Sequence, residues 1–413
     1  MNRRELLKAL SATGILLGAG IPISAARAAR ANQYYIFVSA SGGWDVTSIC
    51  DPKGDVLYSE SRGVINHYPV SAIRQVGNIR YAPAINPNYA GLDWLDDFMR
   101  RHYSDLRVYN GINFGTNSHS LGTAMSTSGK HSSLQPVAPA FLAAPYGKDM
   151  PMPFYLGGGH GETGGLVGAS RLTDVGMIQR LTESNPYLPD HVMAEIDWHH
   201  KQQMDELEYD MNSEAERNAL LEFMQAHANK GEMARLADRL PASPSSGNKG
   251  RAEIAAAALA AGVTATVSLS SGGFDTHRNH DVNQNNAIMN YFELVSHLIN
   301  ELERQGIASQ TMIVMSSDFS RTPWFNSGNG KDHWMTGSMM VWSRELNGNR
   351  VIGATDGQIK PVKLNKETLM PDSGGIELTP THLHLALRER AGMLGSSYDR
   401  AYPLFGEVLD LLS

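Results

Sequence analysis

Three short apolar runs, each followed within a few residues by an aspartate, most constrain the fold of this chain. The pairs are Tyr34–Ala40 with Asp45, Val263–Ser270 with Asp275, and Thr311–Met315 with Asp318. Continuous apolar runs of this length are typical of strands that are buried on both faces of a parallel sheet. Because parallel strands bring their carboxyl ends to one edge of the sheet, where ligands bind, the sequence predicts a site at that edge.

Histidines accompany two of these aspartates. His277 lies two residues after Asp275, and His333 follows the Asp318 segment. An aspartate after a strand is often only a helix cap, and an isolated histidine is usually a satisfied core or surface residue. The recurrence of carboxylate and imidazole at several strand ends instead favours a metal-assisted hydrolase.

Segments with helical spacing alternate with these strand-like runs. We expect a further strand at Leu106–Asn110 and helices at Ser118–Thr127, Ala252–Ala261, Asn286–Gln305 and Thr379–Leu394. This alternation indicates an α/β domain in which a mainly parallel sheet is sandwiched by helices.

Residues 190–240 alternate charged and apolar side chains with helical spacing, and a Pro- and Ser-rich stretch follows at 241–247. We therefore expect a peripheral helical insertion at about 186–247 within a domain that spans 29–413. The Gly-rich stretch 157–165 lacks both nucleotide-binding fingerprints, so we interpret it as a flexible loop and do not expect a NAD-type oxidoreductase.

The amino terminus has the pattern of a twin-arginine export signal. Arg3-Arg4 precedes the weakly apolar Ala9–Ile23, and a small-residue cleavage site follows at Ala26–Ala28. The apolar part is too short and too rich in glycine for a stable membrane anchor. We expect residues 1–28 to be removed, the twin-arginine translocase to be a partner during export, and the protein to be periplasmic or secreted.

Composition narrows the classes of partner that the protein can have and the interactions that can stabilise it. The chain has 35 Lys and Arg against 42 Asp and Glu, a net charge of −7, and loss of the export signal makes it more negative. Nucleic acid is therefore not an expected partner. Cys50 is the only cysteine, so stability must come from a hydrophobic core and not from internal disulfides.

Ser118 stands at the predicted start of a helix. Free backbone N–H groups and the positive end of the helix dipole favour an alkoxide and an incoming anion at such a position. The alternative, that Ser118 is merely an N-cap, fits the sequence equally well.

The segment Thr116–Thr127 resembles the nucleophile helix of alkaline phosphatases, in which a T-D-S start is followed by T-A-x-S-T at the same spacing. By that match Ser118 is the nucleophile. The other motifs come in the order that this superfamily shows, listed here as Asp45, Asp275 with His277, Asp318, and His333 before Thr336-Gly337.

More narrowly, four features resemble an exported bacterial family catalogued as domain of unknown function 1501. These are the twin-arginine start, G-G-x-D-T-H at 272–277, S-D-F-x-R-T-P at 317–323 and D-H-W at 332–334. The resemblance covers essentially the whole mature chain and implies an alkaline-phosphatase-like fold.

The resemblance also implies a site with two divalent ions, Zn²⁺ or Mn²⁺, that grips a phosphate or sulfate ester on a small molecule or a polymer. Ser118 would attack in line, with Arg321 as a second catalytic residue. One ion would be held by Asp275, His277 and His333. The other would be held by Asp45, Asp318 and the Ser118 oxygen.

The chain departs from the alkaline phosphatase pattern at two positions. Phe319 stands where those enzymes have a histidine ligand after the strand-end aspartate, and Asn279 stands at a second histidine position. The match there relies on His277 or His280. Phe319 favours an alternative function, that of a non-catalytic, metal-binding relative acting as a binding or assembly protein at the cell envelope.

Overall fold

The computed structural model describes residues 33–84, 92–147, 150–172 and 230–413, together with positions 175, 176, 178, 192, 195, 198, 199 and 202. The expected export signal at 1–28 and most of the expected insertion at 186–247 lie outside the described residues. Near the end of the insertion, Lys230–Ala237 forms helix α9, as the spacing predicts.

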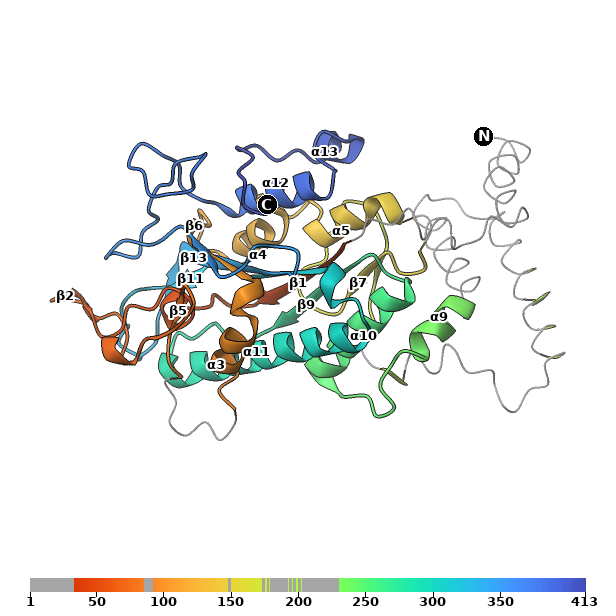
Figure 1. Ribbon diagram of the computed structural model, residues 1–413, viewed down its shortest axis with the longest axis horizontal. Coiled ribbons are helices and arrows are strands. Elements are labelled where there is room, and N and C mark those ends of the chain that lie inside the picture. The colour runs from red at the N-terminus through yellow and green to blue at the C-terminus, as the bar shows by residue number, and fades with distance from the viewer. Residues whose placement is uncertain are drawn as a thin grey trace. The chain divides into compact units, whose positions relative to one another are not determined.

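An eight-stranded sheet is the central layer (Figure 1). Its strands are β1 (Tyr34–Ala40), β6 (Leu106–Asn113), β7 (Phe154–Leu156), β8 (Ala169–Ser170), β9 (Thr266–Ser271), β10 (Thr311–Ser317), β13 (Thr336–Trp342) and β14 (Arg350–Ile352). The order is β14-β6-β13-β10-β1-β9-β7-β8. All neighbouring pairs are parallel except the two made by β13. The predicted mainly parallel sheet is therefore confirmed.

Strand β13 is antiparallel because a hairpin turns the chain back before it. After β10 the chain forms the short strands β11 (Ser320–Arg321) and β12 (His333–Trp334), which pair antiparallel to each other. Antiparallel neighbours need only a short connection, whereas parallel ones need a crossover. The hairpin thus remains beside the carboxyl end of β10.

Helices cover both faces of the sheet (Figure 1). Along one face lie α3 (Trp94–His102), α10 (Gly247–Ala261) and α11 (His280–Arg304), and along the other lie α4 (His119–Ser128), α5 (Ala138–Ala143) and α12 (Pro380–Arg390). Strand β1 contributes to both cores, because side chains alternate along a strand. Ile36 and Val38 pack into the core with the first set, and Tyr35 and Phe37 into the core with the second.

The remaining elements are short. They are the hairpins β2 (Leu57–Ser59) with β3 (Gly63–Val64) and β4 (Arg74–Val76) with β5 (Ile79–Tyr81), helix α13 (Ser397–Ala401), and 3₁₀ turns at Val46–Ser48, Val70–Ala72, Tyr103–Asp105, Ala144–Tyr146 and Ala308–Gln310. In the described part of the chain, no helix combines the length and the hydropathy that a membrane span requires.

Element boundaries differ from the predicted ones where polar residues begin or end an element. Helix α10 begins at Gly247 and not at Ala252, and α11 begins at His280 and not at Asn286. Their first turns carry too few apolar residues to show a helical pattern. Helix α12 ends at Arg390, because Gly392 has a positive φ of 66°, a conformation that suits glycine and ends helices.

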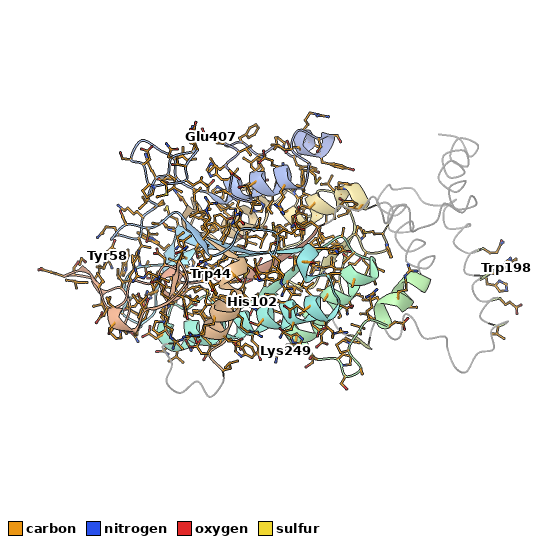
Figure 2. All side chains as sticks on the ribbon, viewed as in Figure 1. Trp44, Tyr58, His102, Trp198, Lys249 and Glu407 are labelled. Carbon is orange, nitrogen blue, oxygen red and sulfur yellow. The ribbon has the colours of Figure 1, made fainter. Side chains whose placement is uncertain are left out.

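His102, at the end of α3, is a titratable group in the core (Figure 2). Its ring lies against Phe98 and Trp342, with ring centroids 5.2 Å and 6.1 Å away. Burial, with a smaller effect of Arg101, lowers the pKa of His102 from 6.5 to about 4. The folded protein therefore keeps this imidazole neutral at pH values at which the unfolded chain protonates it.

We expect His102 to make the free energy of unfolding fall as the pH falls from 6.5 towards 4. The unfolded chain takes up a proton near pH 6.5 and the folded one only near pH 4, so protonation favours unfolding throughout that window. The shift corresponds to about 3 kcal/mol at its full extent. Urea unfolding at pH 7.5 and 4.5 should show a drop about 2–3 kcal/mol larger in the wild type than in His102→Leu.

Leu142→Ala, a substitution in the core on the other face of the sheet and away from His102, is the control and should leave the drop unchanged. Equal drops in the wild type and His102→Leu would contradict the expectation.

Candidate metal centre

Three adjacent strands bring the three predicted aspartates to one edge of the sheet. Asp318 follows β10, Asp45 follows β1 and Asp275 follows β9. Two further segments reach this edge. Strand β12 carries His333, which pairs in register with Arg321 of β11, and the first residue of α4 is His119.

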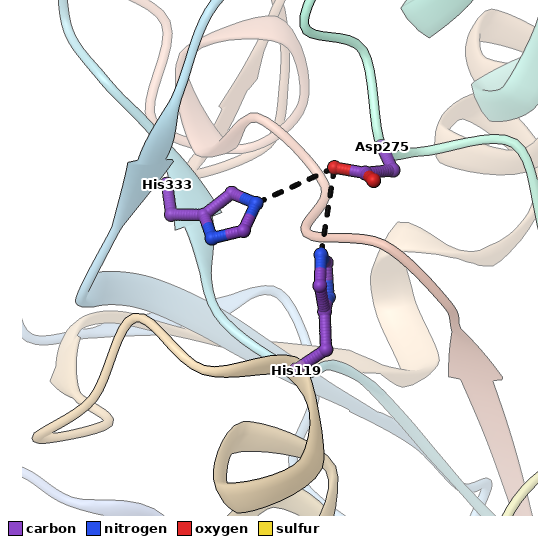
Figure 3. A group of neighbouring side chains, drawn as sticks. All are labelled: His119, Asp275 and His333. Carbon is purple, nitrogen blue, oxygen red and sulfur yellow. Dashed lines mark ion pairs between the residues drawn. The ribbon is translucent and has the colours of Figure 1, made fainter.

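Three imidazoles face one oxygen atom, Oδ1 of Asp275, and Figure 3 shows two of them, His119 and His333. The distances to this oxygen are 3.0 Å from His277 Nε2, 3.4 Å from His333 Nε2 and 3.5 Å from His119 Nε2. The Nε2 atoms of His277 and His333 are 3.0 Å apart. Ligands bound tetrahedrally at about 2.0–2.1 Å from an ion lie about 3.3–3.4 Å from one another. The ligand atoms of His119, Asp275 and His333 all lie within 4.8 Å of one another, which is compatible with binding of a single ion, and His277 contacts two of these three residues.

The other ring nitrogen of each histidine has an oxygen partner. His119 Nδ1 lies 2.5 Å from Asp318 Oδ2, and His277 Nδ1 lies 2.7 Å from Asp332 Oδ1. His333 Nδ1 lies 2.8 Å from the carbonyl oxygen of Asn117. A carbonyl or ionised carboxylate can only accept, so each Nδ1 carries the proton. In a neutral ring this leaves the Nε2 lone pair available for a metal.

Two observations fit this arrangement to a divalent ion. Nε2 of His119 is buried and has no hydrogen-bond partner among the described residues, although it faces a carboxylate. Oxygen acceptors behind metal-bound imidazoles are also the usual means of fixing their orientation. Within the described residues, His119, Asp275 and His333 form a group that could hold a metal ion.

Asp318 is placed at this centre through His119. One of its oxygens is next to His119 Nδ1, and the other accepts hydrogen bonds from Gly42 N at 3.2 Å and Ser317 Oγ at 3.1 Å. In the structure Asp318 contacts the His119 imidazole from the side opposite to its Nε2, and the role of Asp318 as a metal ligand stays a prediction.

Phe319 supports two of the imidazoles. Its ring centroid lies 4.8 Å from that of His119 and 4.6 Å from that of His333. In this chain the imidazole beside Asp318 thus comes from α4, and the residue after Asp318 provides an apolar surface beneath the histidines.

Arg321 is fully buried, and its role differs from the predicted catalytic one. Its guanidinium donates to the carbonyl oxygens of Gly42, Gly43 and Lys331, and to Asp275 Oδ1 at 2.6 Å. Partial burial raises the pKa of Asp275, but the hydrogen bond and the charge of Arg321 lower it further, so the net pKa is below its usual value. Arg321 positions Asp275 and has no exposed surface with which to touch a substrate.

Asp45 lies in a separate, fully buried cluster, which corrects its proposed role as a metal ligand. Its Oδ2 is 2.6 Å from Lys331 Nζ and 3.0 Å from His280 Nε2, and all three side chains are inaccessible to solvent. Burial raises the pKa of Asp45, but Lys331 and His280 outweigh this and hold it well below the usual range. The cation beside Asp45 is an ammonium group.

Ser118 is the N-cap residue of α4, as the alternative interpretation held, but its side chain makes no capping hydrogen bond. It is exposed, and its Oγ shares a hydrogen bond of 3.1 Å with Ser120 Oγ. Its chain neighbours Asn117 and His119 both belong to the centre. Among the described contacts, the Ser118 hydroxyl reaches only Ser120, so Ser118 is placed near the centre through its chain neighbours alone.

Sequence reasoning brought Asp275, His277, Asp318 and His333 to one site but missed three side chains. His119 directly follows the proposed nucleophile, and Asp332 directly precedes His333. The neighbouring motif residues could therefore have indicated both. Lys331 had no such signal.

A sequence model of the family described as "Protein of unknown function (DUF1501)" matches residues 174–370. The predicted resemblance to that family is confirmed over this range, which contains Asp275, His277, Asp318 and His333 but not Ser118. No curated protein matches the chain.

Several solved structures are similar to it. Ps i-CgsB, in complex with k-i-k-neocarrahexaose, is 10% identical with a TM-score of 0.40, over 91% of this chain and 74% of that one. The PsFucS1 sulfatase from Pseudoalteromonas sp. is 10% identical with a TM-score of 0.38, over 94% and 73%. The phosphonate monoester hydrolase of Agrobacterium radiobacter is 11% identical with a TM-score of 0.34, over 91% and 78%.

Removing the acceptor behind one imidazole should weaken metal binding. We expect Asp332→Ala to reduce the affinity for Zn²⁺ by roughly 10- to 100-fold, because His277 loses the partner that fixes its Nδ1 proton and its orientation. Titration against a chelator of known affinity measures this. Asp97→Ala breaks the carboxylate pair with Arg101 on α3 and should leave the affinity unchanged. Wild-type affinity in Asp332→Ala would count against the proposed support of His277.

The buried pair of Asp45 and Lys331 should matter for stability. Lys331→Met leaves Asp45 as an uncompensated buried charge and should lower the free energy of unfolding by about 3–5 kcal/mol. The double variant Asp45→Asn/Lys331→Met should recover much of this loss in urea unfolding. The matched control Lys249→Met breaks a partly exposed pair with Glu293 and should cost about 0–1 kcal/mol. A similarly small cost for Lys331→Met would show that the pair is not closely buried.

Proposed function

We propose that this protein is a periplasmic, metal-dependent hydrolase of phosphate or sulfate esters that uses Ser118 as its nucleophile. The observation that carries the proposal is the convergence of three imidazoles, each fixed at Nδ1, on Asp275 Oδ1, with the exposed Ser118 directly before one of them in the chain. Such a site can hold a cation and a reactive hydroxyl side by side, which is the combination that ester hydrolysis of this type requires.

His119, His277, His333 and Asp275 would hold the ion. Imidazole and carboxylate ligands in this number suit Zn²⁺, with Mn²⁺ as the next choice. When bound, such an ion offsets negative charge on the ester oxygens and lowers the pKa of a neighbouring hydroxyl. The side chains of His119 and His277 are 40% and 44% exposed, so an ester can reach the centre from solvent.

Ser118 would form a bond from its Oγ to phosphorus or sulfur while the bond to the alcohol oxygen breaks. The hydroxyl proton leaves with the departing alcohol. Water then displaces the Ser118 oxygen, which restores the hydroxyl and releases phosphate or sulfate. The first N–H groups of α4 have no partner within the helix and favour the anionic oxygens of the ester.

The proposal includes export by the twin-arginine translocase and an ester on a small molecule or a polymer. The predicted signal and the net negative charge support an exported protein that does not bind nucleic acid.

Substitution of Ser118 separates chemistry from metal binding. Ser118→Ala should lower the turnover of a responsive aryl phosphate or sulfate by about 10³-fold or more, with metal content unchanged, because Ser118 is not among the four proposed ligands. His333→Ala should lose metal and activity together. Turnover is measured with metal-loaded mature protein, and metal content by elemental analysis.

Ser120→Ala is the matched control, since it removes the neighbouring hydroxyl on the same turn and should retain most of the activity. Undiminished activity in Ser118→Ala would exclude the serine as nucleophile. If the metal-loaded wild type turns over no phosphate or sulfate ester, the alternative of a metal-binding envelope protein is favoured, with Phe319 as its sequence signal.

A further inference from the structure

We infer that the centre holds one divalent ion, and that the ammonium group of Lys331 takes the place of a second ion. The inference rests on the metal-dependent function proposed above and specifies its site. It departs from the two-ion arrangement that the sequence resemblance implies, in which Asp45, Asp318 and Ser118 would hold the second ion.

Both oxygens of Asp45 are already engaged. Oδ1 accepts hydrogen bonds from the Thr47 amide at 2.8 Å and the Thr47 hydroxyl at 2.7 Å. Oδ2 accepts from Lys331 Nζ at 2.6 Å, His280 Nε2 at 3.0 Å and Ser48 Oγ at 3.3 Å. A carboxylate has about four acceptor positions, so none is left for a metal.

The other two proposed ligands of the second ion are engaged as well. Asp318 contacts His119 through one oxygen and Gly42 and Ser317 through the other. Ser118 Oγ is hydrogen-bonded to Ser120. Among the described residues, the group of His, Cys, Asp and Glu side chains that could hold an ion is His119, Asp275 and His333, and it includes neither Asp45 nor Asp318.

The charge of Asp45 is also neutralised. Lys331 is fully buried, lies 5.1 Å from the ring centroid of Phe325, and donates to Asp45. His280 contacts Asp45 through Nε2 and Thr276 Oγ1 through Nδ1, and because burial lowers the pKa of His280 below its ordinary value, the ring is neutral at pH 7. The cluster has no net charge, and a divalent ion beside Asp45 would be repelled by the ammonium at close range.

The cluster is joined to the first site through the backbone. Lys331 N donates to the carbonyl of Thr276, which lies between Asp275 and His277, and the Lys331 carbonyl accepts from Arg321. Lys331 also directly precedes Asp332 and His333 in the chain. These links are made by backbone atoms of Lys331, so replacement of its side chain leaves them in place.

Metal stoichiometry tests the inference without a substrate. Mature protein purified without chelators is equilibrated with excess Zn²⁺ or, separately, Mn²⁺, freed of unbound ion, and analysed by elemental analysis and native mass spectrometry. We expect one ion per chain in the wild type. Asp45→Asn/Lys331→Met should also bind one ion, because this pair is not part of the site, and His119→Gln should lose the ion.

Two ions per wild-type chain would overturn the inference, as would loss of the ion in the folded Asp45→Asn/Lys331→Met variant. The double variant is used because it leaves no unpaired charge in the core, and circular dichroism verifies its folding. One ion without turnover of any ester would support the inference and reject the proposed function. Two ions with turnover would reject the one-ion inference and support the proposed function. The absence of any bound ion would overturn the inference and the proposed function together.

Discussion

The position of a single carboxylate oxygen, Oδ1 of Asp275, determines the candidate centre. Arg321 holds this atom with a guanidinium that is itself fixed by carbonyls of the loop after β1 and of the residue before Asp332. Three imidazoles then approach from three different segments. The geometry of the centre therefore derives from the packing of β1, β9 and β10, since the loop that carries Asp275 does not by itself position the oxygen.

Phe319 stands where the alkaline phosphatase pattern has a histidine, and the structure nevertheless places an imidazole beside Asp318. By comparison with the alkaline phosphatase pattern, the phenylalanine removes an imidazole from the end of β10. The structure places the imidazole of His119, the first residue of α4, beside Asp318. The ring of Phe319 packs against this imidazole. Phe319 therefore does not leave Asp318 without an imidazole neighbour.

Much of the fold was predictable because its strands are buried on both faces and read as uninterrupted apolar runs, as in Tyr34–Ala40. The gathering of Asp275, His277, Asp318 and His333 followed from the same rule about strand ends. Lys331 was not predictable, since most lysines are exposed and only the folded chain shows that this one is buried beside Asp45. His119 also required the structure, because sequence does not reveal that the start of α4 faces the end of β10.

Residues that are hydrogen-bonded to one another at this edge of the sheet are far apart along the chain. Gly42 and Asp318 are separated by 276 positions, and Asp45 and Lys331 by 286. Contacts between such distant residues close large loops, which makes them slow to form. The ligands can therefore meet only after the first strand has been inserted between β9 and β10. A chain that lacks its first strand would keep every histidine of the centre and lose the place where they meet.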